Sequence, residues 1–209
     1  QVAFTVLAAL SVVDALDRIP ELQDRVRIKW VNDVLVDDAK VAGLLAYTLT
    51  QGATVSTAVL GIGINVETVP DVPRSPFVPA VGSLKQLAPG ATRVSQGQVL
   101  TTLMETLDSN YRILLDQGYE PLVARYRDRS SIEGAHVAIC SDESDGEPEV
   151  LRRGRVTALG AGLELYLDDG GEPVTRGRLM FLDESTKQTP TSDPEGSGGA
   201  RARTQGRRY

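Results

Sequence analysis

The clearest structural signal in this chain is the stretch KWVNDVLV at residues 29–36, followed by KVAG at residues 40–43. Apolar and charged residues alternate as this stretch begins, which is the period of a strand with one buried face. Two aspartates between the segments form an acidic turn signal. The pattern therefore predicts three strands in antiparallel order, over residues 26–30, 34–36 and 40–47.

Another apolar segment covers residues 55–66 and contains GIGIN at residues 61–65. It predicts a long strand, and its part from 58 to 64 is expected to be buried on both faces. Apolar residues at helical spacing predict one helix before these strands and two after them, over residues 2–16, 99–114 and 121–129. A helix behind an antiparallel meander indicates an α+β fold rather than a doubly wound parallel sheet.

The residue composition of the chain changes after residue 130. Short apolar segments are separated there by glycines and acidic residues, which predicts a small β-barrel of about fifty residues. From about residue 185 onward almost nothing apolar remains, so disorder is expected. The predicted organisation is therefore a domain over residues 1–130, a barrel over 131–183 and a disordered tail over 184–209.

The composition excludes several classes of protein. The net charge of −6 leaves no sequence-wide basic field, so nucleic acid is not an expected partner. No apolar run reaches the roughly 20 residues that span a membrane. Cys140 is the single cysteine and His136 the single histidine, which rules out an intrachain disulfide and any mechanism that needs two histidines. A reducing compartment, the cytoplasm, is the expected location.

Lys40 is the first candidate for chemistry. It follows the acidic turn and begins a strand that enters the core, where an ammonium would bind a phosphate or carboxylate strongly. The alternative is a solvated lysine at a hairpin edge. Gly43, Gly61 and Gly63 lie within strands, where a glycine either lets a ligand approach the backbone or marks a bulge or close packing.

Polar residues follow two of the predicted strands. Asn32 and Asp33 come after Trp30, and Asn65 ends the glycine-containing strand. Each asparagine is either a turn residue or an amide that holds a nucleotide or a loop, and Asp33 could serve as a base or orienting group. Lys29 either faces this site or lies on the polar face of a half-exposed sheet.

These three blocks, extended to KVAGLL at 40–45 and VLGIGINV at 59–66, closely resemble biotin protein ligases. That family usually has Lys-Trp-Pro-Asn-Asp, then Lys-(Leu/Val)-Ala-Gly-Ile-Leu, then Gly-(Ile/Ala)-Gly-(Ile/Leu)-Asn, in this order and at this spacing. The resemblance spans roughly residues 1–182. It implies a mixed sheet with helices, like that of class II aminoacyl-tRNA synthetases, followed by an SH3-like barrel.

The resemblance also implies a reaction in two steps. Biotin and ATP, with Mg²⁺, form biotinyl-5′-adenylate, and a lysine of a biotin carboxyl carrier protein then takes the biotinyl group. Lys40 and Asp33 match the positions of catalytic residues in this scheme. The positions that match ligand-binding residues of the family are Lys29, Asn32, Lys40, Gly43, Gly61, Gly63 and Asn65. Homodimerisation through a sheet edge is compatible with the sequence.

Two departures from the family pattern bear on this expectation. Val31 stands where the family usually has proline, which removes no reactive group. The family's Gly-Arg-Gly-Arg-x-Gly-Arg loop has no counterpart in the sequence. We therefore expect a truncated ligase whose isolated activity is low or absent. Alternative hypotheses are a relative of lipoate ligase or octanoyltransferase, and a non-catalytic binding or dimerisation module with the same fold.

Overall fold

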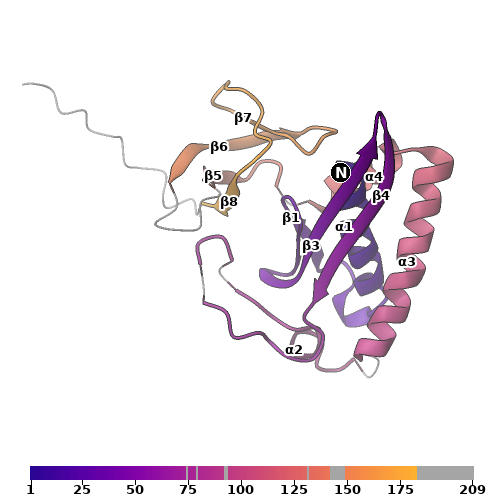
Figure 1. The fold of residues 1–209 in the computed structure, drawn as a ribbon. Coiled ribbons are helices and arrows are strands. Elements are labelled where there is room, and N and C mark those ends of the chain that lie inside the picture. Colours follow the sequence, from indigo (N-terminus) through magenta and orange to yellow (C-terminus); the bar gives the residue numbers. More distant parts are fainter. Residues whose placement is uncertain (74, 79, 92–93, 131, 142–148, 183–209) are drawn as a thin grey trace, which may run out of the picture.

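A computed structural model of the chain describes residues 1–73, 75–78, 80–91, 94–130, 132–141 and 149–182 (Figure 1). The predicted tail over residues 184–209 lies outside these described residues. The chain begins with helix α1 (Val2–Asp17) and a short 3₁₀ turn, η1 (Pro20–Leu22). A first sheet, a helical middle segment and a second sheet then follow along the sequence.

The first sheet contains β1 (Val26–Lys29), β2 (Asp33–Val36), β3 (Ala39–Gln51) and β4 (Thr54–Ile64), in this order and antiparallel throughout. The predicted antiparallel meander is confirmed, whereas the mixed sheet that the resemblance implied is not seen among the described strands. Lys29 of β1 pairs with Asp33 of β2, and Asp33 in turn pairs with Gly43 of β3. The motif residues therefore meet at one end of the sheet.

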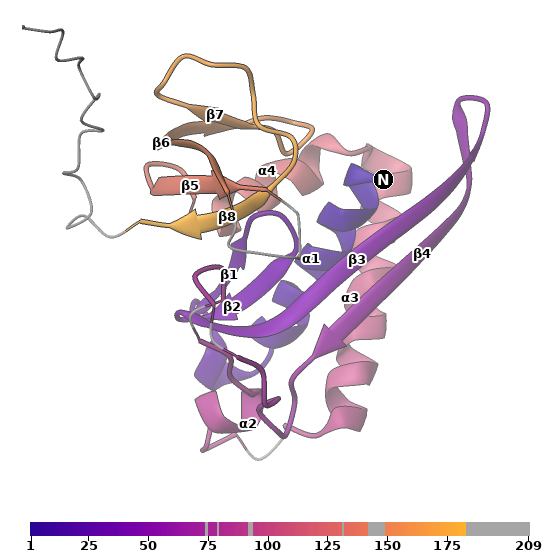
Figure 2. The ribbon, with the colours of Figure 1, turned by 60° about the vertical axis from the view of Figure 1, so that its left-hand side comes forward.

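Three helices follow the first sheet: α2 (Leu84–Leu87), α3 (Gln96–Gln117) and α4 (Glu120–Arg129). Ser95 caps α3, because its hydroxyl accepts a hydrogen bond from the Gln98 backbone amide. Gly118 ends this helix with a φ of 84°. The long helices α1 and α3 lie together on one side of the first sheet (Figure 2).

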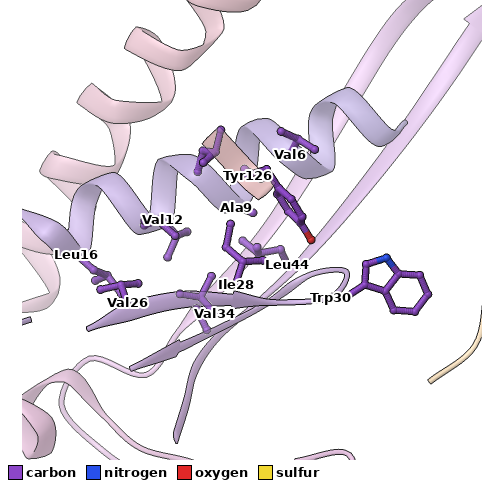
Figure 3. Packing of buried hydrophobic residues seen from close by; sticks show 14 of the residues in the cluster. Val6, Ala9, Val12, Leu16, Val26, Ile28, Trp30, Val34, Leu44 and Tyr126 are labelled. Carbon is purple, nitrogen blue, oxygen red and sulfur yellow. The ribbon is translucent and has the colours of Figure 1, made fainter. Parts of the chain in front are cut away.

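The main core lies between α1 and the first sheet (Figure 3). Apolar side chains recur along the inner face of α1 and meet the buried positions of three strands. These residues, all almost fully buried, are Val6, Ala9, Val12, Leu16, Val26, Ile28, Val34 and Leu44. Trp30 extends away from them, beyond the end of β1 (Figure 3). Helical spacing in α1 and alternation in the strands thus predicted the same interface from both sides.

The other face of the first sheet is open along β3 and β4. Leu45, Tyr47 and Val59 are 68%, 59% and 57% exposed, and no residue of β4 is buried. The expectation that residues 58–64 are buried on both faces is therefore wrong. The helices pack only on the opposite face, and β4 is the outermost strand of the described sheet.

The second sheet has the strand order β7-β6-β5-β8. Its members are β5 (His136–Cys140), β6 (Val150–Leu159), β7 (Leu165–Leu167) and β8 (Arg178–Phe181), paired antiparallel. Cys140 is buried here as a free thiol, as expected. Closure of this sheet into an SH3-like barrel, and the likeness to class II aminoacyl-tRNA synthetases, stay predictions.

Hydrogen bonds from the end of β1 and from the junction of α3 and α4 reach the loop between β6 and β7. The Trp30 indole donates to the Leu163 carbonyl at 2.7 Å, and the Tyr119 hydroxyl donates to the Ala161 carbonyl at 2.8 Å. These bonds place the second sheet beside the end of β1 that carries the KWVND motif. Among the described residues, no helix is both long and apolar enough to cross a membrane.

Candidate anion-binding site

A cavity of about 660 Å³ lies where the motif meets the second sheet. The first sheet contributes Lys29, Asn32, Asp33 and Lys40 to its wall, and the strand β8 region contributes Arg176 and Arg178. Four cationic side chains thus face the cavity, against Asp33 as the one carboxylate in its described lining. This imbalance suits a ligand with several negative charges.

Lys40 and Asp33 form an ion pair across β2 and β3. The Lys40 ammonium nitrogen lies 2.5 Å from Asp33 Oδ1, and the two side chains are 29% and 16% exposed. Lys40 is therefore a half-buried, paired lysine, not a solvated one at a hairpin edge. An ammonium in this position can exchange its carboxylate partner for a phosphate oxygen of a ligand.

Gly43 lies beside this pair. A Cβ atom at residue 43 would lie 3.4 Å from Lys40 Cε and 3.5 Å from its ammonium nitrogen. The cross-strand partner of Gly43 is Gly63, so two bare positions lie side by side on the sheet. The Lys40 side chain lies over Gly43 at ordinary contact distances, so the role of Gly43 toward a ligand stays a prediction.

Lys29 is the most buried cation of the site, with 8% of its surface exposed. Its ammonium donates a hydrogen bond to the Phe77 carbonyl. Burial lowers the pKa of Lys29, and the nearby Lys40 and Arg178 charges lower this pKa further, while Asp33 opposes the shift. The sequence had left a lysine on a polar, half-exposed face as an alternative, and this alternative is wrong because loop residues cover the side chain.

The two asparagines hold backbone segments around Lys40. The Asn32 amide donates to the Leu44 carbonyl at 2.5 Å, and the Asn65 amide donates to the Gly82 carbonyl at 3.0 Å. Asn65 also lines a neighbouring cavity of about 260 Å³, together with Gly43 and Lys40. Lys40 therefore belongs to the walls of both cavities.

Gly61 and Gly63 lie outside both cavities, on the exposed face of β4. A Cβ atom at Gly63 would meet the Gly43 carbonyl at 3.9 Å, and one at Gly61 would meet Leu45 at 3.8 Å. These are ordinary contact distances, so packing within the described chain does not require glycine at either position. Their role toward a ligand stays a prediction.

The sequence and the fold are both similar to those of known proteins. A model of the Biotin/lipoate A/B protein ligase family matches residues 1–65. The biotin--[acetyl-CoA-carboxylase] ligase of Paracoccus denitrificans is 30% identical over 182 residues, which cover 82% of this chain and 65% of that relative. In sequence and in fold, the chain is therefore similar to biotin protein ligases.

Other proteins show the same similarity. The bifunctional ligase/repressor BirA of Bacillus subtilis is 28% identical over 118 residues, 56% of this chain and 35% of that relative. The solved biotin protein ligase from Aquifex aeolicus in complex with biotin and ATP has a similar fold, with a TM-score of 0.65 and 18% identity over 87% of this chain and 72% of that chain. The chain spans less than two thirds of the length of the curated relatives that it matches.

Three lining residues of the cationic cavity were missed by sequence reasoning: Phe77, Arg176 and Arg178. Phe77 lies in a proline-rich segment that the sequence marks only as a surface loop. The two arginines flank Gly177 in an Arg-Gly-Arg triplet, but in the sequence they lie more than a hundred residues after the KWVND motif. Only the packing of the second sheet brings them to the cavity.

A second large cavity, of about 680 Å³, lies between the end of α1 and the start of α3. Its described lining carries Arg18 and Glu21 but none of the residues that the family motifs share. Arg18 is already paired with Glu105 at 2.5 Å. The cationic cavity beside Lys40 is therefore the better candidate for the functional site.

Proposed function

We propose that this chain acts in biotin protein ligation, as a biotin--[biotin carboxyl-carrier protein] ligase. Biotin is activated by ATP to biotinyl-5′-adenylate, and the biotinyl group passes to a lysine of a carrier protein. The observation that supports this most is the half-buried Lys40, which lies beside Asp33 between two cavities, within motifs that this family shares. The proteins from Paracoccus denitrificans and Aquifex aeolicus are named as biotin ligases, which favours biotin as the acid.

In the first step, a carboxylate oxygen of biotin bonds to the α-phosphorus of ATP, and the bond from this phosphorus to the bridging oxygen breaks. Pyrophosphate leaves with the electron pair. Both the acid and the nucleotide are anions, so their approach is opposed by charge. The Lys40 ammonium, held in a partly desolvated site, offsets this repulsion and stabilises the charge that develops on the phosphate.

In the second step, the amine of a carrier lysine attacks the acyl carbon, and AMP leaves with the bonding electrons. The amine must lose a proton to do so. Asp33 is the carboxylate of the described lining that can accept it, once a phosphate has drawn Lys40 out of the ion pair. Lys29 stays buried against the Phe77 carbonyl and contributes positive potential.

Magnesium enters this scheme with the nucleotide. The described residues contain no group of three or more histidine, cysteine or acidic side chains that could hold a metal ion. Mg²⁺ is commonly held by one or two carboxylates together with substrate phosphates, and Asp33 is available for such a part. When bound, the ion would neutralise phosphate charge.

A lipoate ligase or octanoyltransferase activity is the second candidate, because the matching family model covers lipoate enzymes too. These reactions would use the same lysine and a different acyl chain. Titration of biotin and lipoate against each other, in the presence of magnesium-ATP, separates the two. Biotin is expected to displace lipoate and not the reverse.

The central test compares thermal and urea unfolding of the chain with and without biotin plus magnesium-ATP. A ligand at about a hundred times its Kd stabilises the folded state by about 2.7 kcal/mol. We expect this stabilisation in the parent, its loss in Lys40→Ala, and its retention in Lys85→Ala, whose lysine is exposed on α2. Equal stabilisation of parent and Lys40→Ala would contradict the role of Lys40 and favour a non-catalytic module.

A further inference from the structure

Tyr126 connects helix α4 to the turn within the KWVND motif. It is the largest of the fully buried side chains in the described part of the chain, and its hydroxyl donates a hydrogen bond to the Val31 carbonyl at 2.8 Å. Val31 lies between β1 and β2 and lines the cationic cavity. The motif blocks of the sequence end at residue 66, so nothing in them assigns a role to this tyrosine.

Helix α4 is fixed to α1 on both sides of Tyr126. Two arginines of α4, Arg125 and Arg129, form ion pairs with Asp14 and Asp17 of α1. Between these pairs the tyrosine ring enters the core, with its oxygen directed toward the first sheet (Figure 3). The hydroxyl therefore has a fixed position, from which it can hold another segment of the chain.

The Tyr126 hydroxyl stays protonated, as a donor must. Burial raises its pKa well above the ordinary value of 10.0, and the nearby Tyr119 and Asp33 raise this pKa further. The Val31 carbonyl can only accept a hydrogen bond. The bond therefore persists over the whole pH range in which a ligand would bind.

The same turn is held from its other side by β3. The Asn32 amide donates to the Leu44 carbonyl at 2.5 Å, and the Leu44 backbone amide donates to the Asn32 carbonyl at 3.0 Å. The Val31 carbonyl belongs to the planar peptide unit before Asn32, and the Asn32 carbonyl belongs to the unit after it. With both units held, the directions of the Asn32 and Asp33 side chains are fixed.

Asp33 carries this constraint into the site, because its carboxylate lies 2.5 Å from the Lys40 ammonium. Without the Tyr126 hydroxyl, the Val31 carbonyl would lose its donor, which is costly for a group withdrawn from water. The freed peptide would turn toward water in the cavity that Val31 lines. The carboxylate that follows two residues later would then move relative to Lys40.

We propose that Tyr126 is a positioning residue of the candidate site. Its hydroxyl holds the peptide between Val31 and Asn32, and this peptide sets the Asn32 amide and the Asp33 carboxylate in the orientation that receives the ligand. The identity of that ligand, biotin with magnesium-ATP, rests on the proposed function. The site is thereby supported by α4 as well as by the strands that carry its side chains.

The first test compares nuclear magnetic resonance spectra of the isotope-labelled full chain. Tyr126→Phe removes the hydroxyl and retains the ring. We expect the backbone amide signals of Asn32 and Asp33 to shift, together with the side-chain amide signal of Asn32. The side-chain amide of Asn65, which donates to the Gly82 carbonyl, should keep its signal. Unchanged signals at Asn32 and Asp33 would overturn the proposal.

Tyr119→Phe is the matched control. The Tyr119 hydroxyl also donates to a backbone carbonyl at 2.8 Å, that of Ala161 in the loop between β6 and β7. Its loss removes the same chemical group without freeing the Val31 peptide, so the Asn32 and Asp33 signals should stay in place. Equal shifts in the two variants would indicate a general loosening of the fold and would contradict a positioning role.

The second test measures binding of biotin in the presence of magnesium-ATP by equilibrium dialysis. Tyr126→Phe is expected to weaken binding about tenfold, the order of one hydrogen bond, whereas Tyr119→Phe should bind as the parent does. Equal affinity of the two variants would overturn the positioning role. No binding by the parent would overturn the proposed function, and the amide signals alone would then decide whether Tyr126 holds the turn.

A measurement on the parent keeps the proposal falsifiable if Tyr126→Phe does not fold. A buried, hydrogen-bonded hydroxyl proton exchanges slowly with water, so the Tyr126 hydroxyl should give a resonance of its own. This resonance should show cross-peaks to protons of Val31 and Asn32. Their absence would show that the hydroxyl does not reach the turn, and the proposal would be wrong.

Discussion

At the scale of single residues, the site combines cations that differ in burial. Lys29 is almost fully covered and donates to a backbone carbonyl, whereas Lys40 is half-buried and paired with a carboxylate. A buried ammonium loses hydration that one neutral carbonyl replaces only in part. Lys29 therefore adds positive electrostatic potential to the cavity and lowers the stability of the folded chain. Lys40 is the cation that can move toward a ligand.

The burial of Lys29 has a measurable effect on the pH dependence of stability. Burial lowers its pKa below the ordinary value of 10.5, so the folded chain releases this proton at a lower pH than the unfolded chain. Between the lowered pKa and 10.5 the unfolded chain binds more protons, and the free energy of unfolding rises with pH. We expect Lys29→Met to lack this rise.

Urea unfolding at a series of pH values up to about 10.5 checks this expectation. The quantity to compare is the free energy of unfolding of the parent minus that of Lys29→Met, because other titrating groups cancel in the difference. Lys85→Met, which changes an exposed lysine, should show no such difference. Parallel curves for parent and Lys29→Met would show that the lysine is not buried as a cation.

At the scale of elements, short turns determine where the strands place their side chains. Asp37 has a φ of 52° in the turn that joins β2 to β3, and this turn sets the register that places Asp33 beside Lys40. Gly177 performs the same task before β8. In both cases a residue that tolerates the left-handed region is required by the backbone.

Gly177→Ala should therefore destabilise the chain. The new Cβ atom would lie 2.8 Å from both the Cys140 carbonyl oxygen and the Ile139 side chain, at a φ of 115°. We expect a loss of about 2–4 kcal/mol in the free energy of unfolding, from strain and overpacking together. Gly170→Ala is the control, since its φ is 69° with no atom within 4 Å, and it should lose only about 1 kcal/mol. Similar losses in both would mean that β8 does not pack this closely on β5.

At the scale of the whole molecule, the site depends on how the two sheets are joined. Trp30 lies within the KWVND motif, yet its indole binds the carbonyl of Leu163 in the second half of the chain. Leu163 is buried and has a φ of 63°, a conformation that needs support from its surroundings. The KWVND motif, which the sequence indicates only as part of the site, thus also connects the two sheets.

We expect Trp30→Phe to weaken this joint. The substitution leaves the buried Leu163 carbonyl without its donor, which costs about 1–3 kcal/mol of unfolding free energy. Urea unfolding measures the loss. Tyr111→Phe, a change at an exposed aromatic residue of α3, should leave the stability unchanged. Equal stability of Trp30→Phe and the parent would show that the hydrogen bond to Leu163 does not support the joint.

Several features of this protein were determined by the sequence alone. Alternation over residues 26–30 and helical spacing in α1 predicted the strands, the helix and the interface between them, because such periodicities report which face an element buries. The KWVND and KVAG blocks identified Lys29, Asn32, Asp33 and Lys40 together, because a tight antiparallel hairpin brings residues that are close in sequence to one end of a sheet. Their roles in ligation stay proposals.

Other features were decided only by the tertiary structure. The exposed face of β4 was not predicted, because an apolar run does not show whether both faces find a partner to cover them. Arg176, Arg178 and Phe77 could not be placed either, because their approach to Lys29 depends on packing between segments far apart in the chain. Local patterns record periodicity and turns, whereas the second wall of the cavity arises from long-range contacts that such patterns do not encode.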